Sequence, residues 1–451
     1  MAIPHSSRRV VGAVAAALAL TLGLSACGSS DTGGNAESTD ATGDAAGGDS
    51  SADADHEPVT IRFAWWGSDT RHEVTQKVIE AFETEYPYIT VEPDYTSWDN
   101  YFEKLNVAAA GNDLPDVITQ EERFLTEYAD RGLLANLDEL GLDTANIDES
   151  VLQSGTIDDA LYGIATGINV HAIIADPQAF ADAGVEMPDD TTWTWDDYEQ
   201  IATDISAGST DGAYGVQDYS FIEPVLKIIA RQKGEEVFTA DGEVGVSAAT
   251  VEEFFQRSVD LQAAGGEPDA SVSTEIQAAG VEGSLPATNK GAMAWFWSNQ
   301  LNAVQTASGR DLVLLRAPGE SEFERTGEYF KPSMYYSVSA KSEHPEESQL
   351  LVDFLINSNA AGELILSDRG LPANTEVRAH VLPMLSDADK LSAEFVENLQ
   401  DVVVDGTPVP PVGAGEVPDI TSRINSDVLF GKITPAQAAE QWIDEVTKAI
   451  S

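Results

Sequence analysis

Residues 59–66 read VTIRFAWW, a run in which β-branched and aromatic side chains alternate with other residues. This alternation predicts a strand that ends at Gly67. Between Val74 and Phe82 apolar side chains recur at helical spacing, so a helix is expected to follow. A strand followed by a helix is the first half of the unit from which parallel sheets are built.

The alternation of strands and helices continues beyond this unit. A second strand is expected at 89–91, a helix at 98–110 and a third strand at 116–119. Such units form sheets with helices on both faces, and ligands bind in the loops beyond the carboxyl ends of the strands. The three loops in question are Gly67–Arg71, Tyr95–Trp98 and Gln120–Arg123.

The remaining elements are less regular. Residues 161–174 look extended, and further strands are expected at 292–297, 312–315 and 335–338. From residue 348 onward the pattern is mainly helical. The chain contains no short internal repeat, which argues against solenoids and propellers.

The first residues indicate export from the cell. Arg8 and Arg9 precede the apolar run 10–24, which is shorter than the roughly 20 residues that a membrane-spanning helix needs and suits a signal peptide over residues 1–26. The run ends in Leu24-Ser25-Ala26-Cys27, which resembles a bacterial lipobox. We therefore expect Cys27 to carry lipid after cleavage, and the alternative is an ordinary signal peptide with an incidental cysteine.

Residues 27–58 form a linker of unusual composition. After Cys27 it holds eight acidic residues, no Lys or Arg, and few side chains that could be buried, so we expect a flexible tether. Cys27 is also the only cysteine of the chain. A disulfide framework is thereby excluded, and the sequence argues against a thiol enzyme or a Cys-ligated metal site.

The charge of the chain narrows its partners. Removing Arg8 and Arg9 with the signal peptide leaves 22 basic residues against 77 acidic ones. A field of this sign repels nucleic acids and polyphosphates and tolerates neutral or cationic ligands. The acidity also has a simpler explanation as a solubility trait.

The part of the chain beyond the linker is longer than a single hydrophobic core usually accommodates, so two lobes are expected.

Several segments of the body carry a resemblance to a known family. They are FAWWGSDTR (63–71), LPDVI (114–118), EERF (121–124), YADRGLL (128–134), LYGIATG (161–167) and GAMAWFWS (291–298). In this order they resemble the extracellular solute-binding proteins of carbohydrate ABC importers, the family that includes the maltose-binding protein.

The resemblance implies a fold and its division. The fold is α/β, a two-lobed periplasmic-binding-protein fold of type II in which each lobe is a mainly parallel sheet with helices on both faces. Lobe I is expected at 59–168 and 316–358, and lobe II at 169–315 and 359–451. The hinge between them is expected near Gly167 and again at 315–318.

The resemblance also implies a function. The chain is expected to be the substrate-binding lipoprotein of an ABC importer, which captures a mono- or oligosaccharide between its lobes and delivers it to the permease. It would lie on the outer face of the cell membrane, held there only by its lipid. We expect a monomer that uses no cofactor or metal, catalyses no reaction and binds no nucleic acid.

Candidate site residues follow from the chemistry of sugars. A sugar ring presents hydroxyls in its plane and apolar C–H faces, so a receptor needs aromatic platforms together with charged or amide groups. The aromatic candidates are Trp66, Trp98, Tyr219, Trp295 and Trp297, of which the last two face the same way if they lie on a strand. The polar candidates are Asp69, Arg71, Gln120, Glu122, Arg123, Asn169, Asn299, Lys331 and Arg369. Among these, Glu122 and Arg123 match an Asp-Arg pair of the family.

Two other functions remain open from the sequence. An extracellular glycoside hydrolase would need two carboxylates about 5 to 10 Å apart, and the neighbours Glu121 and Glu122 tend to point apart. A receptor for a non-sugar solute, such as a polyamine, would suit the acidic field. The sequence contains no His-Glu-x-x-His, Gly-x-Ser-x-Gly or phosphate-loop motif, which argues against several other enzyme classes.

Overall fold

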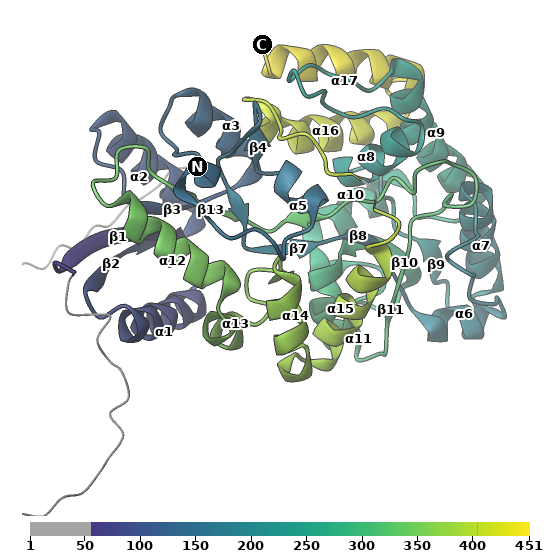
Figure 1. Ribbon diagram of the computed structural model, residues 1–451. Helices are drawn as coiled ribbons and strands as arrows, with labels where there is room; N and C mark the ends of the chain where they lie inside the picture. The colour runs from purple at the N-terminus through teal and green to yellow at the C-terminus, as the bar shows by residue number, and fades with distance from the viewer. Residues whose placement is uncertain (1–55, 404) are drawn as a thin grey trace, which may run out of the picture. The chain divides into compact units, whose positions relative to one another are not determined.

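Two large sheets organise the chain, and each has a hydrophobic core of its own (Figure 1). The computed structural model describes residues 56–403 and 405–451. The predicted signal peptide, Cys27 and most of the predicted linker lie outside these residues. Within the described part of the chain, every helix is too short or too polar to cross a lipid bilayer.

The first sheet has the strand order β2-β1-β3-β13-β6. Its strands are β1 (Val59–Trp66), β2 (Ile89–Thr96), β3 (Val117–Gln120), β6 (Ile164–Ala165) and β13 (Tyr335–Val338). As predicted, β1 lies parallel to β2 and to β3. The helices of its core are α1 (Asp69–Glu85), α2 (Trp98–Ala110), α3 (Glu122–Asp130), α4 (Leu137–Leu140), α5 (Glu149–Gln153), α12 (Pro345–Asn357), α13 (Asn359–Ile365), α14 (Thr375–Val381) and α15 (Asp387–Leu399).

Local sequence explains the first of these helices. The hydroxyl of Ser68 accepts a hydrogen bond from the backbone amide of Arg71 and caps α1. Val78, Ile79 and Phe82 recur at helical spacing on one face and are buried in the first core. Helix α12 packs across β1, β3 and β13 (Figure 1).

The second sheet has the strand order β11-β8-β10-β9. Its strands are β8 (His171–Ala175), β9 (Tyr214–Val216), β10 (Gly291–Trp297) and β11 (Val313–Leu315). The helices of its core are α6 (Pro177–Ala183), α7 (Trp195–Gly208), α8 (Glu223–Gln232), α9 (Ala248–Ala264), α16 (Val417–Leu429) and α17 (Pro435–Ala449). Smaller clusters add α10 (Ala270–Ala279) and α11 (Leu301–Ser308) beside it.

Both sheets are mixed: parallel pairing predominates in the first, through β2, β1 and β3, whereas the second is mainly antiparallel, and there the prediction of a mainly parallel sheet is wrong. Every antiparallel pair in the two sheets involves β6, β8, β11 or β13. These are the strands next to the places where the chain passes from one core to the other. β8 begins beside the end of β10, and β13 begins beside the end of β3, so each runs antiparallel to that neighbour.

A small third sheet lies at these crossings. It consists of β12 (Lys331–Pro332), β7 (Gly167–Asn169) and β14 (Leu371–Pro372), with β7 in the middle. A Cβ atom on Gly167 would lie 2.3 Å from the carbonyl oxygen of Arg369, so only glycine allows this approach of two backbones. The predicted hinge glycine is thus the central contact of the connecting sheet.

The cores divide the chain differently from the predicted lobes at two places. Residues of α13 and α14, including Ala361 and Val377, are buried in the first core although 359–451 were assigned to lobe II. Ala317 and Tyr329 are buried in the second core although 316–358 were assigned to lobe I. The apolar stripe of a helix shows that it is buried but does not show which sheet buries it. Helices α16 and α17 join the second core, together with α9 (Figure 1).

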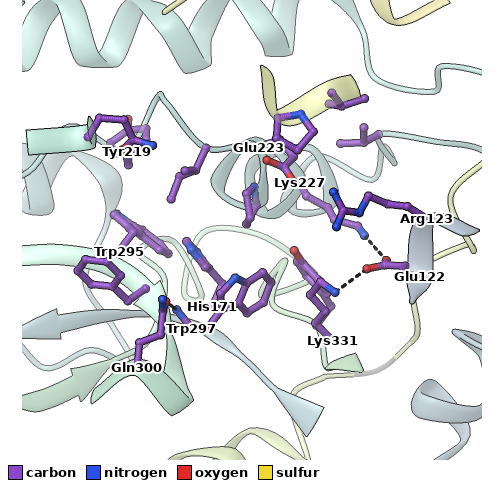
Figure 2. Close-up of a pocket in the computed structure, with 18 of the residues that line it drawn as sticks. Glu122, Arg123, His171, Tyr219, Glu223, Lys227, Trp295, Trp297, Gln300 and Lys331 are labelled. Atoms are coloured by element: carbon purple, nitrogen blue, oxygen red, sulfur yellow. Dashed lines mark hydrogen bonds and ion pairs between the residues drawn. The ribbon is translucent and has the colours of Figure 1, made fainter. Parts of the chain in front are cut away.

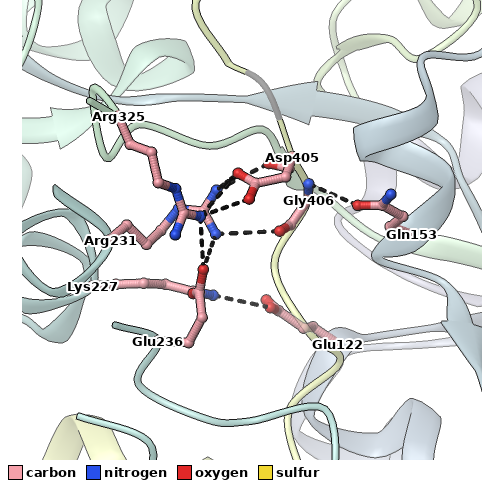
Figure 3. A network of polar contacts seen from close by, with 8 residues as sticks. All are labelled: Glu122, Gln153, Lys227, Arg231, Glu236, Arg325, Asp405 and Gly406. Carbon is pink, nitrogen blue, oxygen red and sulfur yellow. Dashed lines mark hydrogen bonds and ion pairs between the residues drawn. The ribbon is translucent and has the colours of Figure 1, made fainter. Parts of the chain in front are cut away.

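A network of ion pairs holds the segment that follows α15 (Figure 3). The guanidinium of Arg231 on α8 donates to the carboxylate and the carbonyl oxygen of Asp405 at 2.6 and 2.9 Å, and to Glu236 at 2.6 Å. Arg325 also donates to Asp405 and Glu236. On the other side, the amide of Gly406 donates to Gln153 of α5 at 2.9 Å. Residues 405–406 therefore bind elements of both cores.

Glu328 makes the stability of this fold depend on pH. Its side chain is buried, one carboxylate oxygen accepts from the amide of Ala317 at 2.9 Å, and the other has no partner among the described residues. Burial raises the pKa of Glu328 from its ordinary value of 4.5 to about 8. Between these two pH values the folded state binds a proton that the unfolded state releases, so stability falls as pH rises and levels off above pH 8.

Glu328→Gln is expected to flatten this dependence, because glutamine stays neutral and keeps an acceptor for Ala317. Over pH 5.5 to 8, the native protein is expected to lose about 1 kcal/mol more per pH unit than the variant in urea unfolding. Glu324→Gln, an exposed position on the same loop, serves as the control. Equal slopes for all three proteins would contradict the assignment.

Candidate functional site

A cavity of about 470 Å³ lies between elements of the two cores (Figure 2). Its size is within the range of sites for small molecules. The first core contributes the start of α3, and the second contributes β8, β10, α8 and the start of α16. Lys331 of the connecting sheet, the end of α10 and several loop residues also line it.

One wall of the cavity is aromatic. Trp295 and Trp297 alternate along β10, and His171 on β8 is the register partner of Trp297. The rings of His171 and Trp295 are stacked, with centroids 5.6 Å apart and an interplanar angle of 13°. The indole N–H of Trp295 donates to the hydroxyl of Tyr198 at 3.1 Å, which fixes this ring, whereas Trp297 is only partly buried. Tyr219 also lines the cavity.

His171 takes part as a neutral ring. Burial lowers the pKa of His171 to about 3, so its imidazole is uncharged at physiological pH. Its Nδ1 atom is buried and has no partner among the described residues. The ring therefore contributes apolar surface and one free nitrogen to the wall.

The opposite side carries charges. Glu122 lies 2.8 Å from the ammonium of Lys331 and 4.0 Å from that of Lys227 (Figure 2). Burial alone would raise the pKa of Glu122, but Lys331 and Lys227 together lower it to about 2. Next to it, the Nε atom of Arg123 donates to Glu121 at 2.9 Å, and Glu121 also caps α3. Glu122 is therefore ionised at neutral pH, and Lys331, Lys227 and Arg123 surround it with basic side chains.

Helix α8 adds two more charged side chains. Glu223 and Lys227 lie one turn apart on this helix, and both line the cavity. The ammonium of Lys227 lies 4.5 Å from the ring centroid of Tyr329. Burial raises the pKa of Glu223 and lowers that of Lys227, because both charged forms lose hydration there.

The structure brings six of the predicted site residues together in this lining. They are Glu122, Arg123, Tyr219, Trp295, Trp297 and Lys331. Gln120 and Asn169 are buried and do not belong to the lining; both amide atoms of Gln120 lack a partner among the described residues, and Asn169 donates to Ser333 at 2.7 Å.

The other predicted site residues lie outside the cavity lining. Trp66 is buried and packs edge-to-face against Trp98, with centroids 5.1 Å apart. Trp98 is 39% exposed and lies beneath the guanidinium of Arg123, at 6.0 Å from its ring centroid to Cζ. Asn299 is exposed and follows the end of β10.

The first loop and the loop after α13 bind each other instead of facing the cavity. Arg71 forms an ion pair of 2.8 Å with Asp368, and Asp69 is exposed in the first turn of α1. Arg369 is buried, donates to Thr75 and lies over the ring of Tyr336. These contacts hold the loops onto α1.

The lining residues that sequence reasoning missed include His171, Glu223, Lys227 and Tyr329. A glutamate and a lysine four residues apart on a helix are typical of a solvated surface, so the spacing in α8 gave no sign of a cavity. A histidine in an apolar strand is equally typical of a core. The only indication in the sequence that α8 lies at the cavity was that it begins shortly after Tyr219, a predicted site residue.

Comparison with known proteins shows what this chain is similar to. The model of the bacterial extracellular solute-binding protein family matches residues 67–361. An uncharacterized lipoprotein from the oleD 5′ region of Streptomyces antibioticus is 27% identical over 333 residues, which cover 71% of this chain and 71% of that protein.

Solved structures share the fold over nearly the whole described chain. An extracellular solute-binding protein of family 1 from Alicyclobacillus acidocaldarius is 28% identical, with a TM-score of 0.76 and coverage of 88% of this chain and 100% of that chain. A periplasmic oligogalacturonide-binding protein from Yersinia enterocolitica is 23% identical, with a TM-score of 0.76 and coverage of 87% and 100%. The predicted α/β periplasmic-binding-protein fold is confirmed.

Proposed function

The chain belongs to the bacterial extracellular solute-binding protein family, and from this premise we propose that it captures a mono- or oligosaccharide for an ABC importer. The observation that carries the proposal is the composition of the cavity. Trp295, Trp297 and Tyr219 offer flat apolar surface to the faces of a sugar ring, and Glu122 and Arg123 offer strong hydrogen bonds to its hydroxyls. The chain then delivers the sugar, as a monomer, to the permease.

Capture is proposed to close two lobes around the connecting sheet. The cavity is lined by α3 from the first core and by β10 and α8 from the second, so a ligand there contacts both. A ligand that contacts both lobes stabilises their closed arrangement over the open one. Gly167 in β7 is the proposed hinge, since its backbone lies against residues 369–371 on one side and its carbonyl oxygen accepts from the amide of Ser333 at 2.9 Å on the other.

The two rival functions are less well supported. A glycoside hydrolase needs one ionised and one protonated carboxyl on either side of the scissile bond. The cavity holds Glu122, which two lysines keep ionised, and Glu223, whose pKa burial raises, so it is the family of the chain, one of binding proteins, that argues against a hydrolase. A polyamine would meet the cations of Arg123, Lys227 and Lys331 as well as four acidic side chains, of which one is already paired with Arg123. Repulsion from the three cations opposes its binding.

A thermal-shift screen tests the proposal. We expect at least one of a panel of neutral and acidic mono- and oligosaccharides to raise the melting temperature, because a ligand that binds only the folded state stabilises it. Spermidine is expected to leave it unchanged. Product analysis of the same mixtures is expected to show intact sugars, and release of shortened sugars at turnover rates would favour the hydrolase instead.

Lipid anchoring of the mature chain is a further part of the proposal. It is supported by the lipobox-like Leu24-Ser25-Ala26-Cys27 and by the lipoprotein relative from Streptomyces antibioticus. Cys27→Ser is expected to release the protein from the membrane fraction into the medium. Retention of the variant in the membrane would contradict this anchor.

A further inference from the structure

The cavity is far less acidic than the chain that contains it. The whole sequence has 24 basic and 77 acidic residues, whereas three basic and four acidic residues line the cavity. Two of the four acidic residues are already bonded within the protein: Glu121 accepts from Arg123, and Asp218 accepts from Ser220 and Asn425. Basic groups are therefore concentrated where the ligand is proposed to bind.

Lys227 lacks a hydrogen-bond acceptor in the part of the chain that the structure describes. Its nearest carboxylate oxygen, on Glu122, is 4.0 Å away, and its side chain is only 15% exposed. An ammonium has three donors, and leaving them without acceptors in a partly buried place costs free energy. The same burial lowers the pKa of Lys227, as expected for an ammonium whose lost hydration is not replaced by contacts with the protein.

Lys227 and Lys331 share a single carboxylate. Glu122 forms its close contact of 2.8 Å with Lys331, so Lys227 is left at the longer distance. Two ammonium groups therefore surround the carboxylate of Glu122, and Glu223, one turn before Lys227, is the next acidic side chain of the lining. The pKa of Glu122, lowered to about 2 despite burial, agrees with a locally positive potential.

The acidic surface of the chain does not cancel this local potential. At physiological ionic strength, charges separated by more than about 8 Å through solvent are largely screened. Lys227 is part of the cavity wall, and a bound ligand would contact it with little solvent between them. The nearest groups therefore decide which charge the cavity prefers.

We infer that the captured sugar carries an acidic group, as in a uronic acid, and that the ammonium of Lys227 binds this group inside the cavity. The inference rests on the proposed function and narrows its ligand. The carboxylate supplies the acceptor that Lys227 lacks, and Trp297, which lines the same cavity (Figure 2), offers its aromatic surface to the ring of that sugar unit.

The opposite choice, an amino sugar, would bind Glu223, which lies one turn before Lys227 and forms no ion pair among the described residues. Burial raises the pKa of Glu223 and lowers that of Lys227, because both charged forms lose hydration in the cavity. The two further cations of the lining, Arg123 and Lys331, oppose the binding of an ammonium there.

Calorimetry with matched sugars tests this inference. The titrations compare galacturonate with galactose, digalacturonate with galactobiose and glucuronate with glucose, with galactosamine as the amine. An acidic sugar is expected to bind about tenfold or more tightly than its neutral counterpart, because a hydrogen bond between charged groups is stronger than one to a hydroxyl. Lys227→Met is expected to abolish this preference.

The control is Lys233→Met at the end of the same helix, where the lysine pairs with Glu253 outside the cavity. This variant is expected to keep the preference. Tighter binding of a neutral sugar or of galactosamine by the native protein would overturn the inference and leave the proposed function standing. If the protein bound neither these sugars nor any sugar of the thermal-shift panel, the proposed function would be wrong, and the inference with it.

Discussion

Asp405→Ala is expected to lower the free energy of unfolding by about 2 kcal/mol, because it removes a charged hydrogen-bond partner, itself 45% exposed, from a buried cation. Arg231 is 1% exposed, and Asp405 accepts its hydrogen bond at 2.6 Å while also accepting from Arg325 (Figure 3). Without this carboxylate, two guanidinium groups share Glu236 as their remaining anion. Urea unfolding at neutral pH measures the loss.

A matched control separates burial from ion pairing as such. Asp427 pairs with Lys432 at 2.7 Å, but the lysine side chain is 63% exposed. Asp427→Ala is therefore expected to cost less than about 1 kcal/mol. Equal losses for the two variants would show that the network around Arg231 contributes no more than an ordinary surface pair.

Trp297→Ala is expected to weaken sugar binding by about 30-fold, or about 2 kcal/mol, because it removes an aromatic platform from the cavity wall. Trp297 is the better test of this wall than Trp295, which is buried, bonded to Tyr198 and part of the second core. Loss of Trp297 is thus expected to affect binding more than folding. Calorimetry with the tightest sugar of the screen, alongside thermal unfolding, measures both.

Trp98→Ala distinguishes the structural assignment from the sequence prediction. Both tryptophans were predicted to bind ligand, but only Trp297 lines the cavity, and Trp98 lies outside the lining beside Arg123. Its replacement is expected to change the affinity less than about threefold, well below a binding hot spot. A larger loss for Trp98→Ala than for Trp297→Ala would mean that the sugar lies elsewhere.

The regular first part of the fold could be predicted because its signals are local. The alternation in β1 and the apolar stripe of α1 depend only on neighbouring residues, and both elements occur at the expected places. The direction of β8 and β13 could not be predicted in this way. It depends on where the chain crosses between the cores, which no local pattern records.

The candidate site was predictable in part for the same reason. Trp295 and Trp297 were placed by the two-residue period of a strand, and Glu122 by the resemblance of its segment to a family. Arg71 was assigned to the ligand, but it pairs with Asp368, which is 297 residues away in the sequence. Lys227 was missed because its place in the cavity depends on the approach of α8 to Glu122 at the start of α3, which the spacing within α8 does not show.

A crystal structure of the protein with its tightest sugar tests the central claim most directly. The account predicts a sugar ring against Trp297, with oxygen atoms of the ligand within hydrogen-bonding distance of Glu122, Arg123 or Lys227. A sugar bound outside this cavity, with Trp297 and Glu122 both free of contact, would contradict it.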